Sequence, residues 1–487
     1  MKSKIVRRLL AASMATVMTV GMAGCGGTET PASSDVPESS ETTPASSEEV
    51  ASSEEEVSPY PILKDENGNV YDLGGMEIII RDWWSDPEGN PAEPTSAYDE
   101  DTLAYREWLM ETYNFTIKQQ GISDWGSAPA DFVEYASAPA DDKNYVFVLR
   151  DDPAISSAMA QGLMYDLSTL SCLDFSEEKF QLNKLHEMYA KGGSIYAMTS
   201  GASEPRTGIY FNKRLLEEAN IDPESIYDMQ AAGTWTWDAW TDIMAQVQRD
   251  VDNDGVIDIY GETQNAGNFT NAAVWSNGGE YVGQDASGKY VYRLEDPETL
   301  EALNWAVSVF NDYSLVYPEG ANWDYYKEAY INGEAVFMVE DAYAGQAQGF
   351  LSEMEDPFGF VMFPKGPQMD DYTNCWTNNL QAIPSNYDEE RAWKIAFAWN
   401  LWTDDTPGWE DSDSWKSGYY AGFSDTRAVD ETLAMMREKG IITYHGVVPN
   451  LQLGPDLTYN IGIGTDVTAT VEAIRDTWKG YIDAANQ

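Results

Sequence analysis

The acidic loop at residues 250–258 has the residue types and the spacing of a metal site. Four carboxylates occupy its first, third, fifth and ninth positions: Asp250, Asp252, Asp254 and Asp258. Gly255 stands at the sixth position, where a sharp turn is needed, and Val256 at the seventh offers its carbonyl oxygen. Loops that wrap oxygen ligands around calcium use this odd-position spacing. The loop is therefore predicted to bind a calcium ion.

The end of the loop departs from that pattern. The twelfth position, where calcium loops carry a bidentate glutamate, is Gly261, and Glu262 comes one place late. The alternative is a loop in which Asp and Asn side chains accept hydrogen bonds from their own backbone. We prefer calcium because four carboxylates this close repel one another unless a cation or water screens them.

A helix is predicted directly before the loop, over residues 237–247. Its apolar residues recur at three- and four-residue steps and therefore share one face: Trp237, Trp240, Ile243, Met244 and Val247. Thr236 stands at the N-cap position, where its hydroxyl can accept a hydrogen bond from a first-turn N–H. The loop thus follows an element that must pack against a core.

Length and charge narrow the classes of protein. A chain of 487 residues exceeds the size at which one core keeps growing, so two or more globular units are expected. The net charge of −53 and the lack of a basic patch exclude nucleic-acid binding, because an acidic surface repels phosphate. The 17 tryptophans and 29 tyrosines suit a surface that grips ligands of mixed polarity.

Histidine and cysteine offer little catalytic chemistry. The two histidines, His186 and His445, lack a second histidine at zinc-site spacing, and we expect both to be packed or surface side chains. Cys172 and Cys375 either form one disulfide or remain two thiols, and the sequence leaves both possibilities open. No acid/base pair stands out by motif, so the protein is not expected to be an enzyme.

The first 69 residues are predicted to stay outside the folded body. Residues 1–24 have a basic start and then an apolar run too short to remain as a membrane span, which is typical of a secretory signal. The signal ends in Met22-Ala23-Gly24-Cys25, which resembles the lipobox of bacterial lipoproteins. Lipidated Cys25 would then anchor the protein at the extracellular face of the cell membrane. Residues 25–69 are acidic and rich in Ser, Thr and Pro, which predicts a disordered tether.

Folding is expected to begin near Val70 with an α/β pattern. Strands are predicted over 76–81, 115–119 and 145–149, with a helix over 98–113 between the first two. In α/β folds, ligands bind beyond the carboxyl ends of strands. Trp83, Trp84, Arg150 and Asp151 stand at such ends and are therefore candidate ligand contacts.

A succession of short motifs then carries a resemblance. They read G-x-x-Y-D-L (162–167), G-G-S-I-Y-A-M (192–198), I-Y-F-N-K-R-L-L-E-E-A-N-I (209–221), T-W-T-W-D-A-W (234–240) and D-x-D-x-D-G-x-x-D-x-Y-G (250–261). Further matches follow in the helical segments 296–312 and 392–401 and in the strand segments 330–339 and 360–367. In this order, the motifs resemble the extracellular solute-binding proteins of family 1, the maltose-binding-protein-like receptors of ABC importers.

The resemblance implies a two-lobed periplasmic-binding-protein-like α/β fold of type II with interlobe crossovers. The first lobe would comprise 70–205 with 377–425, and the second 206–376 with 426–487. The crossovers would fall near 203–208, 374–380 and 422–427. Such a protein closes on a carbohydrate, here expected to be an oligosaccharide, and delivers it as a monomer to ABC permease subunits.

The resemblance and the strand ends together give a set of candidate ligand contacts. These are Trp83, Trp84, Asp151, Glu204, Arg206, Trp275, Trp323, Tyr343, Trp376 and Asn378. Sugars offer C–H groups on one face and hydroxyls at the rim, which aromatic rings and planar polar groups match. Two alternatives remain open: a secreted glycosidase, and a receptor for a peptide, polyamine or modified uronate. The aromatic wealth favours a neutral sugar.

Overall fold

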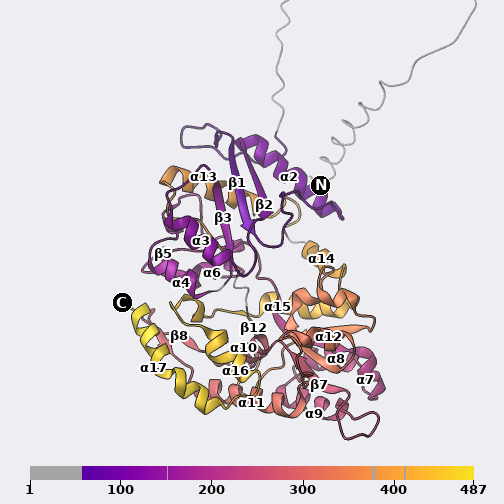
Figure 1. The fold of residues 1–487 in the computed structure, drawn as a ribbon. Helices are drawn as coiled ribbons and strands as arrows, with labels where there is room; N and C mark the ends of the chain where they lie inside the picture. Colours follow the sequence, from indigo (N-terminus) through magenta and orange to yellow (C-terminus); the bar gives the residue numbers. More distant parts are fainter. Residues whose placement is uncertain (1–57, 151, 376–378, 411–412) are drawn as a thin grey trace, which may run out of the picture. The chain divides into compact units, whose positions relative to one another are not determined.

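The computed structural model describes residues 58–150, 152–375, 379–410 and 413–487 (Figure 1). This part of the chain divides into a small unit, 58–71 with 406–410, and a large unit that contains the rest. In the small unit, Lys64 and Val70 form an antiparallel bridge. The turn between them is held by Asp65, whose Oδ1 accepts the N–H groups of Asn67 and Asn69 at 2.9 and 2.8 Å. Ordered structure therefore begins before Val70.

The large unit contains two main sheets, and the first has the order β13-β3-β1-β2. Its strands are β1 (Met76–Asp82), β2 (Phe115–Gly121), β3 (Asn144–Leu149) and β13 (Leu380–Ala382). Strand β1 pairs in parallel with β2 and with β3, whereas β13 pairs antiparallel with β3. The three strands predicted from the sequence in this region are confirmed. Their parallel arrangement brings the carboxyl ends of β1, β2 and β3 to one edge.

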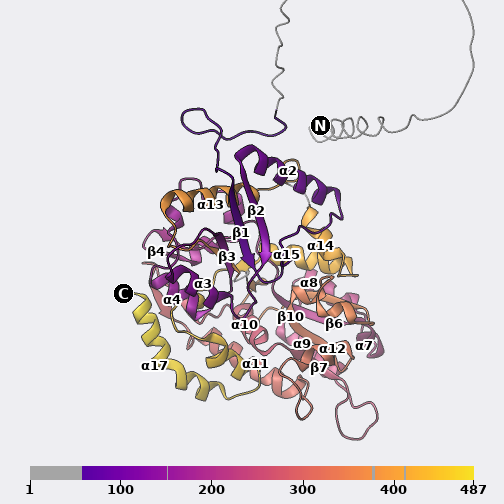
Figure 2. The ribbon, with the colours of Figure 1, turned by 45° about the horizontal axis from the view of Figure 1, so that its top comes forward.

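Helices pack on this sheet in two groups. Helices α2 (Ala97–Tyr113) and α13 (Glu389–Trp402) contact each other, and both contact β2. Figure 2 shows these two helices beside β1 and β2. Helices α3 (Ala128–Ser137) and α4 (Pro153–Ala160) contact each other, and α3 contacts β3. The short helices α5 (Glu178–Gln181) and α6 (Leu185–Met188) precede the hairpin of β4 (Ala190–Lys191) and β5 (Ser194–Ile195).

The second main sheet has the order β11-β6-β10-β7. Its strands are β6 (Thr207–Asn212), β7 (Tyr260–Gln264), β10 (Ala335–Asp341) and β11 (Phe358–Met362). Strand β6 is antiparallel to both of its neighbours, and β10 runs parallel to β7. Every residue of β6 and every residue of β10 except Asp341 is buried, so the middle of this sheet is covered on both faces.

Eight helices and two short strands complete the region from residue 213 to 331 and the C-terminal end. They are α7 (Lys213–Glu218), α8 (Glu224–Ala231), α9 (Trp237–Val247), α10 (Ala266–Ser276), α11 (Pro297–Tyr313), α12 (Tyr325–Ile331), α16 (Tyr459–Ile461), α17 (Val467–Ala485), β8 (Val282–Gln284) and β9 (Tyr290–Tyr292). Helix α8 contacts β11, α9 contacts β7, and α12 contacts both β10 and β7. Helix α17 contacts β9 and α11.

Helix α9 illustrates how local sequence and packing agree. Its five predicted core residues are the five that are buried, and the Thr236 hydroxyl accepts the N–H of Ala239 at 3.3 Å. The Trp240 ring meets Phe337 and Phe363 edge to face, with centroids 6.1 and 5.8 Å apart. Trp237 stacks on Trp305 with a centroid distance of 4.1 Å. An aromatic core thus fixes α9, and with it the start of the acidic loop.

The segment 374–441 contains the short strands that follow the second sheet and lead the chain back to the first sheet. Strand β12 (Asn374–Cys375) pairs in parallel with β14 (Gly440–Ile441), and helices α14 (Lys416–Tyr420) and α15 (Ala434–Glu438) lie between them in the sequence. Because β13 follows β12 and joins the first sheet, the chain passes from the second sheet to the first between residues 362 and 380. The exact lobe boundaries expected from the resemblance stay a prediction.

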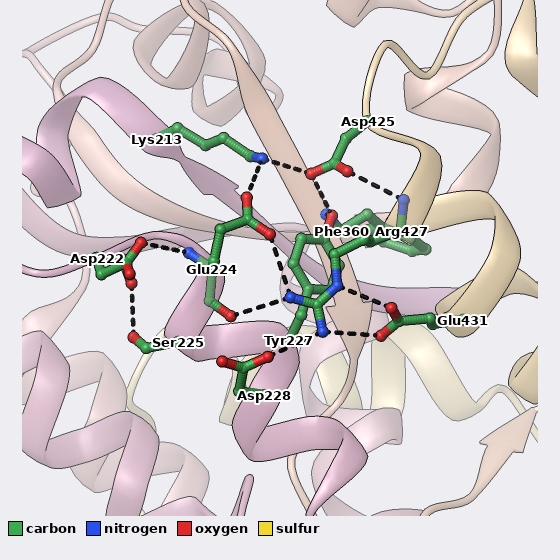
Figure 3. A network of polar contacts seen from close by, with 10 residues as sticks. All are labelled: Lys213, Asp222, Glu224, Ser225, Tyr227, Asp228, Phe360, Asp425, Arg427 and Glu431. Atoms are coloured by element: carbon green, nitrogen blue, oxygen red, sulfur yellow. Dashed lines mark hydrogen bonds and ion pairs between the residues drawn. The ribbon is translucent and has the colours of Figure 1, made fainter.

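A charged network ties the segment 425–431 to the second sheet (Figure 3). Lys213 Nζ lies 2.8 Å from Glu224 Oε1 and 2.6 Å from Asp425 Oδ2. The Tyr227 hydroxyl donates to the same Asp425 oxygen at 2.8 Å and accepts the Phe360 N–H at 3.1 Å. The segment is therefore bonded through one tyrosine to the backbone of β11.

Arg427 forms the other half of this network. Its guanidinium meets Glu224, Asp228 and Glu431 at distances of 3.1, 3.0 and 2.8 Å. Glu224 is thus shared by Lys213 and Arg427, and these two cations together hold the pKa of its carboxyl below the usual value. The shared carboxylate makes the network a single connected unit.

Two further expectations can be compared with the structure. Cys172 is a free thiol that donates to the Trp393 carbonyl oxygen at 3.6 Å, so it forms no disulfide. No helix within the described ranges is both long and apolar enough to span a bilayer. The signal, the lipobox and most of the acidic tether lie at residues 1–57, outside the described residues.

Candidate functional site

The carboxyl end of β1 presents two tryptophans, as the strand-end argument predicted. Asp82, fully buried, accepts the N–H of Trp84 at 3.3 Å and the N–H of Ser85 at 3.1 Å, and thereby fixes the turn. The rings of Trp83 and Trp84 meet edge to face, 5.0 Å apart. The Trp84 side chain is 54% exposed, which leaves its ring available to a ligand.

Trp125 is a third tryptophan at this edge and is exposed, and the sequence analysis did not single it out. It follows β2, and the Arg150 guanidinium lies 4.5 Å from its ring centre. Arg150 also donates from Nε to the Trp125 carbonyl at 3.0 Å and pairs with Asp152 at 2.7 Å. The position of Trp125 after the end of a strand was the feature of the sequence that could have identified it as a candidate contact. Asp151, predicted as a contact here, lies outside the described residues.

In the second sheet, Arg206 and Asp341 join the start of β6 to the end of β10. Arg206 Nη1 lies 3.3 Å from Asp341 Oδ2, and the Thr207 hydroxyl donates to Asp341 Oδ1 at 2.7 Å. The Ala342 N–H donates to the Arg206 carbonyl at 3.2 Å. The expected crossover segment around Arg206 is therefore fixed to the strand end that carries Tyr343.

Tyr343 stands on the short 3-10 turn η2 (Ala342–Gly345) and is 39% exposed. Its hydroxyl makes no hydrogen bond to any described residue. Burial raises the pKa of that hydroxyl, and the carboxylates of Glu340 and Asp341 raise it further. The hydroxyl therefore stays protonated and can donate to a ligand.

Behind Tyr343, Glu340 lies in a buried polar cluster. Glu340 Oε1 accepts from Asn268 Nδ2 and from the Asp341 N–H, both at 2.8 Å, and Oε2 accepts from the Tyr326 hydroxyl. Burial raises the pKa of Glu340, with a further increase from Asp341. These bonds hold the strand end, and hence Asp341 and Tyr343, in one arrangement.

A row of rings continues from Tyr343 along this side. Phe350 meets Tyr343 edge to face with centroids 6.2 Å apart. Lys327 Nζ lies 5.3 Å from the centre of Phe350 and 5.7 Å from the centre of Trp323. Trp323 is 76% exposed, so the row ends in an open ring. The structure therefore connects two of the predicted contacts, Tyr343 and Trp323, through Phe350 and Lys327, which the sequence analysis missed.

Trp415, helix α14 and the residues after it form a second group of aromatic side chains. The Trp415 and Tyr419 rings meet edge to face, 5.9 Å apart, and Tyr419 meets Phe423, which stacks on Tyr210 of β6. Burial raises the pKa of Tyr419 to about 12, and Glu204 adds to this increase, whereas Arg437 and Arg206 oppose it. The charges of Glu204 and Arg206, both predicted contacts, thus act in opposite directions on the pKa of the Tyr419 hydroxyl.

Trp275, another predicted contact, does not join these groups. Trp275 is only 7% exposed, its ring stacks on His445 with a centroid distance of 6.2 Å, and its carbonyl accepts the Thr373 hydroxyl. The Trp275 ring therefore contacts other side chains of the protein and is almost closed to solvent. Trp376 and Asn378 lie outside the described residues, so their roles stay predictions.

The acidic loop brings three of its carboxylates together. Oxygen atoms of Asp250, Asp252 and Asp254 lie within 4.8 Å of one another. Asp258 is not part of this group, and its Oδ2 instead accepts the Val251 N–H at 2.7 Å. Gly255 has a φ of 93°, in the region that favours glycine, and its N–H donates to Asp250 Oδ2 at 2.8 Å. The loop thus combines a carboxylate cluster with the self-capped turn of the alternative interpretation.

One protein-family model matches the middle of the chain. Residues 188–399 match the family described as bacterial extracellular solute-binding protein. No curated protein sequence matches the chain.

Solved structures share the fold at low sequence identity. UgpB from Mycobacterium tuberculosis, in complex with glycerophosphocholine, is 18% identical with a TM-score of 0.55, and the match covers 84% of this chain and 99% of that one. The cyclic alpha-maltosyl-1,6-maltose binding protein from Arthrobacter globiformis is 14% identical with a TM-score of 0.57 and the same coverage. MalE from Bdellovibrio bacteriovorus, bound to maltotriose, is 12% identical with a TM-score of 0.53, over 84% and 99% of the two chains. The two-lobed type II binding-protein fold predicted from the sequence is confirmed.

Proposed function

We propose, from the premise that residues 188–399 belong to the bacterial extracellular solute-binding family, that this protein captures a carbohydrate and delivers it to the permease of an ABC transporter. The observation that carries the proposal is the open row of rings from Tyr343 to Trp323, next to the polar groups around Arg206 and Asp341. A sugar stacks its C–H face on such rings and gives its hydroxyls to such groups.

The proposed contacts fall into two sets. Trp83, Trp84 and Trp125 come from the first sheet, and Tyr343, Trp323 and the Arg206–Asp341 pair come from the second. Trp275, Trp376, Asn378 and Asp151 remain proposed contacts from the family resemblance. Ligand binding to both sets would favour a closed form, because a ligand shifts the population toward the state that it binds better.

We propose binding without turnover. Solute-binding families generally act by capture, and a secreted glycosidase would instead need two carboxyl groups placed on either side of the scissile bond. Incubating the protein with its best-binding oligosaccharide separates the two functions. Unchanged ligand recovered after hours supports capture, whereas shortened products would support the glycosidase.

A thermal-shift screen over neutral and acidic oligosaccharides, followed by calorimetry on the best binder, tests the proposal. We expect Tyr343→Ala to weaken binding about tenfold or more, which corresponds to about 1.4 kcal/mol. Tyr459→Ala provides the matched control, since Tyr459 on α16 is 51% exposed and lies on none of the proposed contact surfaces. If no carbohydrate stabilises the protein, the proposal is wrong.

We further propose that Cys25 is diacylated and tethers the protein to the extracellular face of the membrane. The basis is the lipobox sequence before Cys25, followed by an acidic Ser/Thr/Pro tether. Metabolic labelling with an alkyne fatty acid should mark the wild type and Cys172→Ser but not Cys25→Ser. Labelling that survives Cys25→Ser would refute the anchor.

Calcium binding by the acidic loop is also a proposal. Oxygen ligands within 4.8 Å of one another suit a hard divalent cation, and a loop without the bidentate glutamate fits weak sites with dissociation constants of about 10⁻⁴–10⁻³ M. Asp250, Asp252 and Asp254 would hold the ion, with the Val256 carbonyl. Calorimetry on chelator-treated protein should give calcium heats that Asp252→Asn abolishes. The absence of heat in the wild type would remove the metal.

A further inference from the structure

Arg437 on α15 differs from the other arginines that the structure describes. Each of the others donates a hydrogen bond to a protein oxygen, whereas the Arg437 guanidinium makes no hydrogen bond and no ion pair within the described ranges. The chain has 82 acidic and only 29 basic residues, so carboxylates that could pair with it are abundant. An arginine left unpaired in such a protein needs a reason.

The Arg437 side chain is held in place although it is unpaired. Its guanidinium carbon lies 4.4 Å from the centre of the Trp415 ring, and Trp415 in turn contacts Tyr419. The side chain is half-buried, and this burial lowers the pKa of Arg437 without discharging it. Contact with an aromatic face uses the plane of a guanidinium and leaves its N–H edge able to donate.

Arg437 also lies beside the proposed ligand groups. Helix α15 ends just before β14, which pairs with β12, and Asn374 Nδ2 donates to the Met436 carbonyl at 3.3 Å. The Trp415 ring that Arg437 covers leads through Tyr419 and Phe423 to Tyr210, and the Tyr210 hydroxyl accepts the N–H of Gly345, two residues after Tyr343, at 3.0 Å. Arg437 is therefore placed where the chain crosses between the two sheets, next to the aromatic groups that lead to Tyr343.

Some charged side chains in this region have an ion-pair partner among the described residues and others do not. Asp341 neutralises Arg206 at 3.3 Å, so that pair carries no net charge toward a ligand. The Glu204 carboxylate has no partner among the described residues and is not paired with Arg437. Glu204 is therefore left to accept hydroxyls, and Arg437 is left to receive a negative group.

We propose that the solute is an acidic oligosaccharide and that Arg437 binds its monoanionic substituent, a uronate carboxylate or a sulfate ester. This inference rests on the proposed carbohydrate capture and makes its ligand class specific. A planar guanidinium donates two parallel N–H groups to either oxyanion. A neutral sugar, which the aromatic composition alone favours, would leave this cation without a counter-charge.

The test uses matched sets of trisaccharides: a neutral one, its uronate counterpart and its 6-sulfated counterpart, each for several common hexoses. Affinities are measured by calorimetry for wild type, Arg437→Gln and Arg437→Lys. We expect an acidic member to bind best, and Arg437→Gln to weaken it about 10- to 100-fold, the range for hydrogen bonds to charged groups. The neutral counterpart should change little. Arg437→Lys should recover only part of the loss, because it restores the charge without the planar fork.

Arg475→Gln is the control. Arg475 lies on α17 and already has a protein partner, Glu295, at 2.6 Å. This substitution should leave every affinity unchanged. The preferred acidic member identifies the oxyanion as carboxylate or sulfate. If the best ligand is neutral and Arg437→Gln leaves its affinity unchanged, the inference is overturned and carbohydrate capture stands. If no carbohydrate binds the wild type, both fail.

Discussion

Glu262 of β7 is a buried carboxyl group that should make the stability of the protein depend on pH. It is fully buried, and neither of its carboxyl oxygens has a hydrogen-bond partner among the described residues. Burial raises the pKa of this carboxyl well above the ordinary value of 4.5. The folded protein therefore holds a proton on Glu262 at pH values where the unfolded chain has released it.

The sign and size of the effect follow from proton linkage. The unfolded state binds fewer protons than the folded state above about pH 4.5, so the free energy of unfolding falls as the pH rises. While the folded carboxyl remains protonated, the loss is about 1.4 kcal/mol per pH unit. Between pH 5.5 and 7.5, the wild type should lose at most about 2.7 kcal/mol through Glu262 alone.

Glu262→Gln removes this contribution to the pH dependence of the free energy of unfolding, because an amide does not titrate. The amide still places an unpartnered polar group in the core, which shifts the stability by an amount that does not depend on pH. The informative quantity is therefore the change with pH of the stability difference between variant and wild type. We expect this difference to move in favour of Glu262→Gln by up to about 2.7 kcal/mol from pH 5.5 to 7.5.

Urea unfolding at pH 5.5, 6.5 and 7.5 measures these free energies. Glu217→Gln is the matched control, since Glu217 on α7 is exposed and its side chain makes no bond within the described ranges. Its curve should run parallel to that of the wild type. If Glu262→Gln also stays parallel within about 0.5 kcal/mol, Glu262 does not hold a proton in the folded state and the reasoning fails.

Other predictions concern the charged network, the core and the free thiol. Arg427→Ala should cost about 1–2 kcal/mol in urea unfolding because three carboxylates lose their shared partner, whereas Arg475→Ala should leave the unfolding curve close to that of the wild type; equal losses would contradict a special role for the network. Trp240→Ala should cost about 3–5 kcal/mol because it opens a cavity among fully buried rings, and a cost below about 1 kcal/mol would mean that the ring is not packed as described. Burial raises the pKa of Cys172 to about 12, so native protein should react with a thiol reagent at pH 8 far more slowly than urea-unfolded protein; equal rates would show an accessible thiolate.

Local elements were predictable where short-range periodicity reflects burial. Helix α9 has the predicted N-cap and core face because the side chains that set the period also form the aromatic core. The short antiparallel strand β13 could not be found in this way, because three residues carry no period and their pairing with β3 is non-local. The same holds for β12 and β14.

The candidate site was predictable only in part. Trp84 and Tyr343 follow strand ends, and position alone pointed to them. Trp415 and Arg437 stand in segments that resemble ordinary solvated helices, so their types carry no signal. The lack of an ion-pair partner for Arg437 depends on neighbours far along the chain. Trp275 shows the opposite case, since a motif match says nothing about what a ring contacts once folded.

The late arrival of β13 and α13 bears on how the molecule is assembled during synthesis. Strand β3 is complete at Leu149, yet the partner that covers its free edge begins only at Leu380, and α13 follows that partner. A ribosome must therefore translate the whole second sheet before the first can be finished. Until then the first sheet keeps an unprotected edge, so folding is slow and shortened chains that end before residue 380 are prone to aggregate.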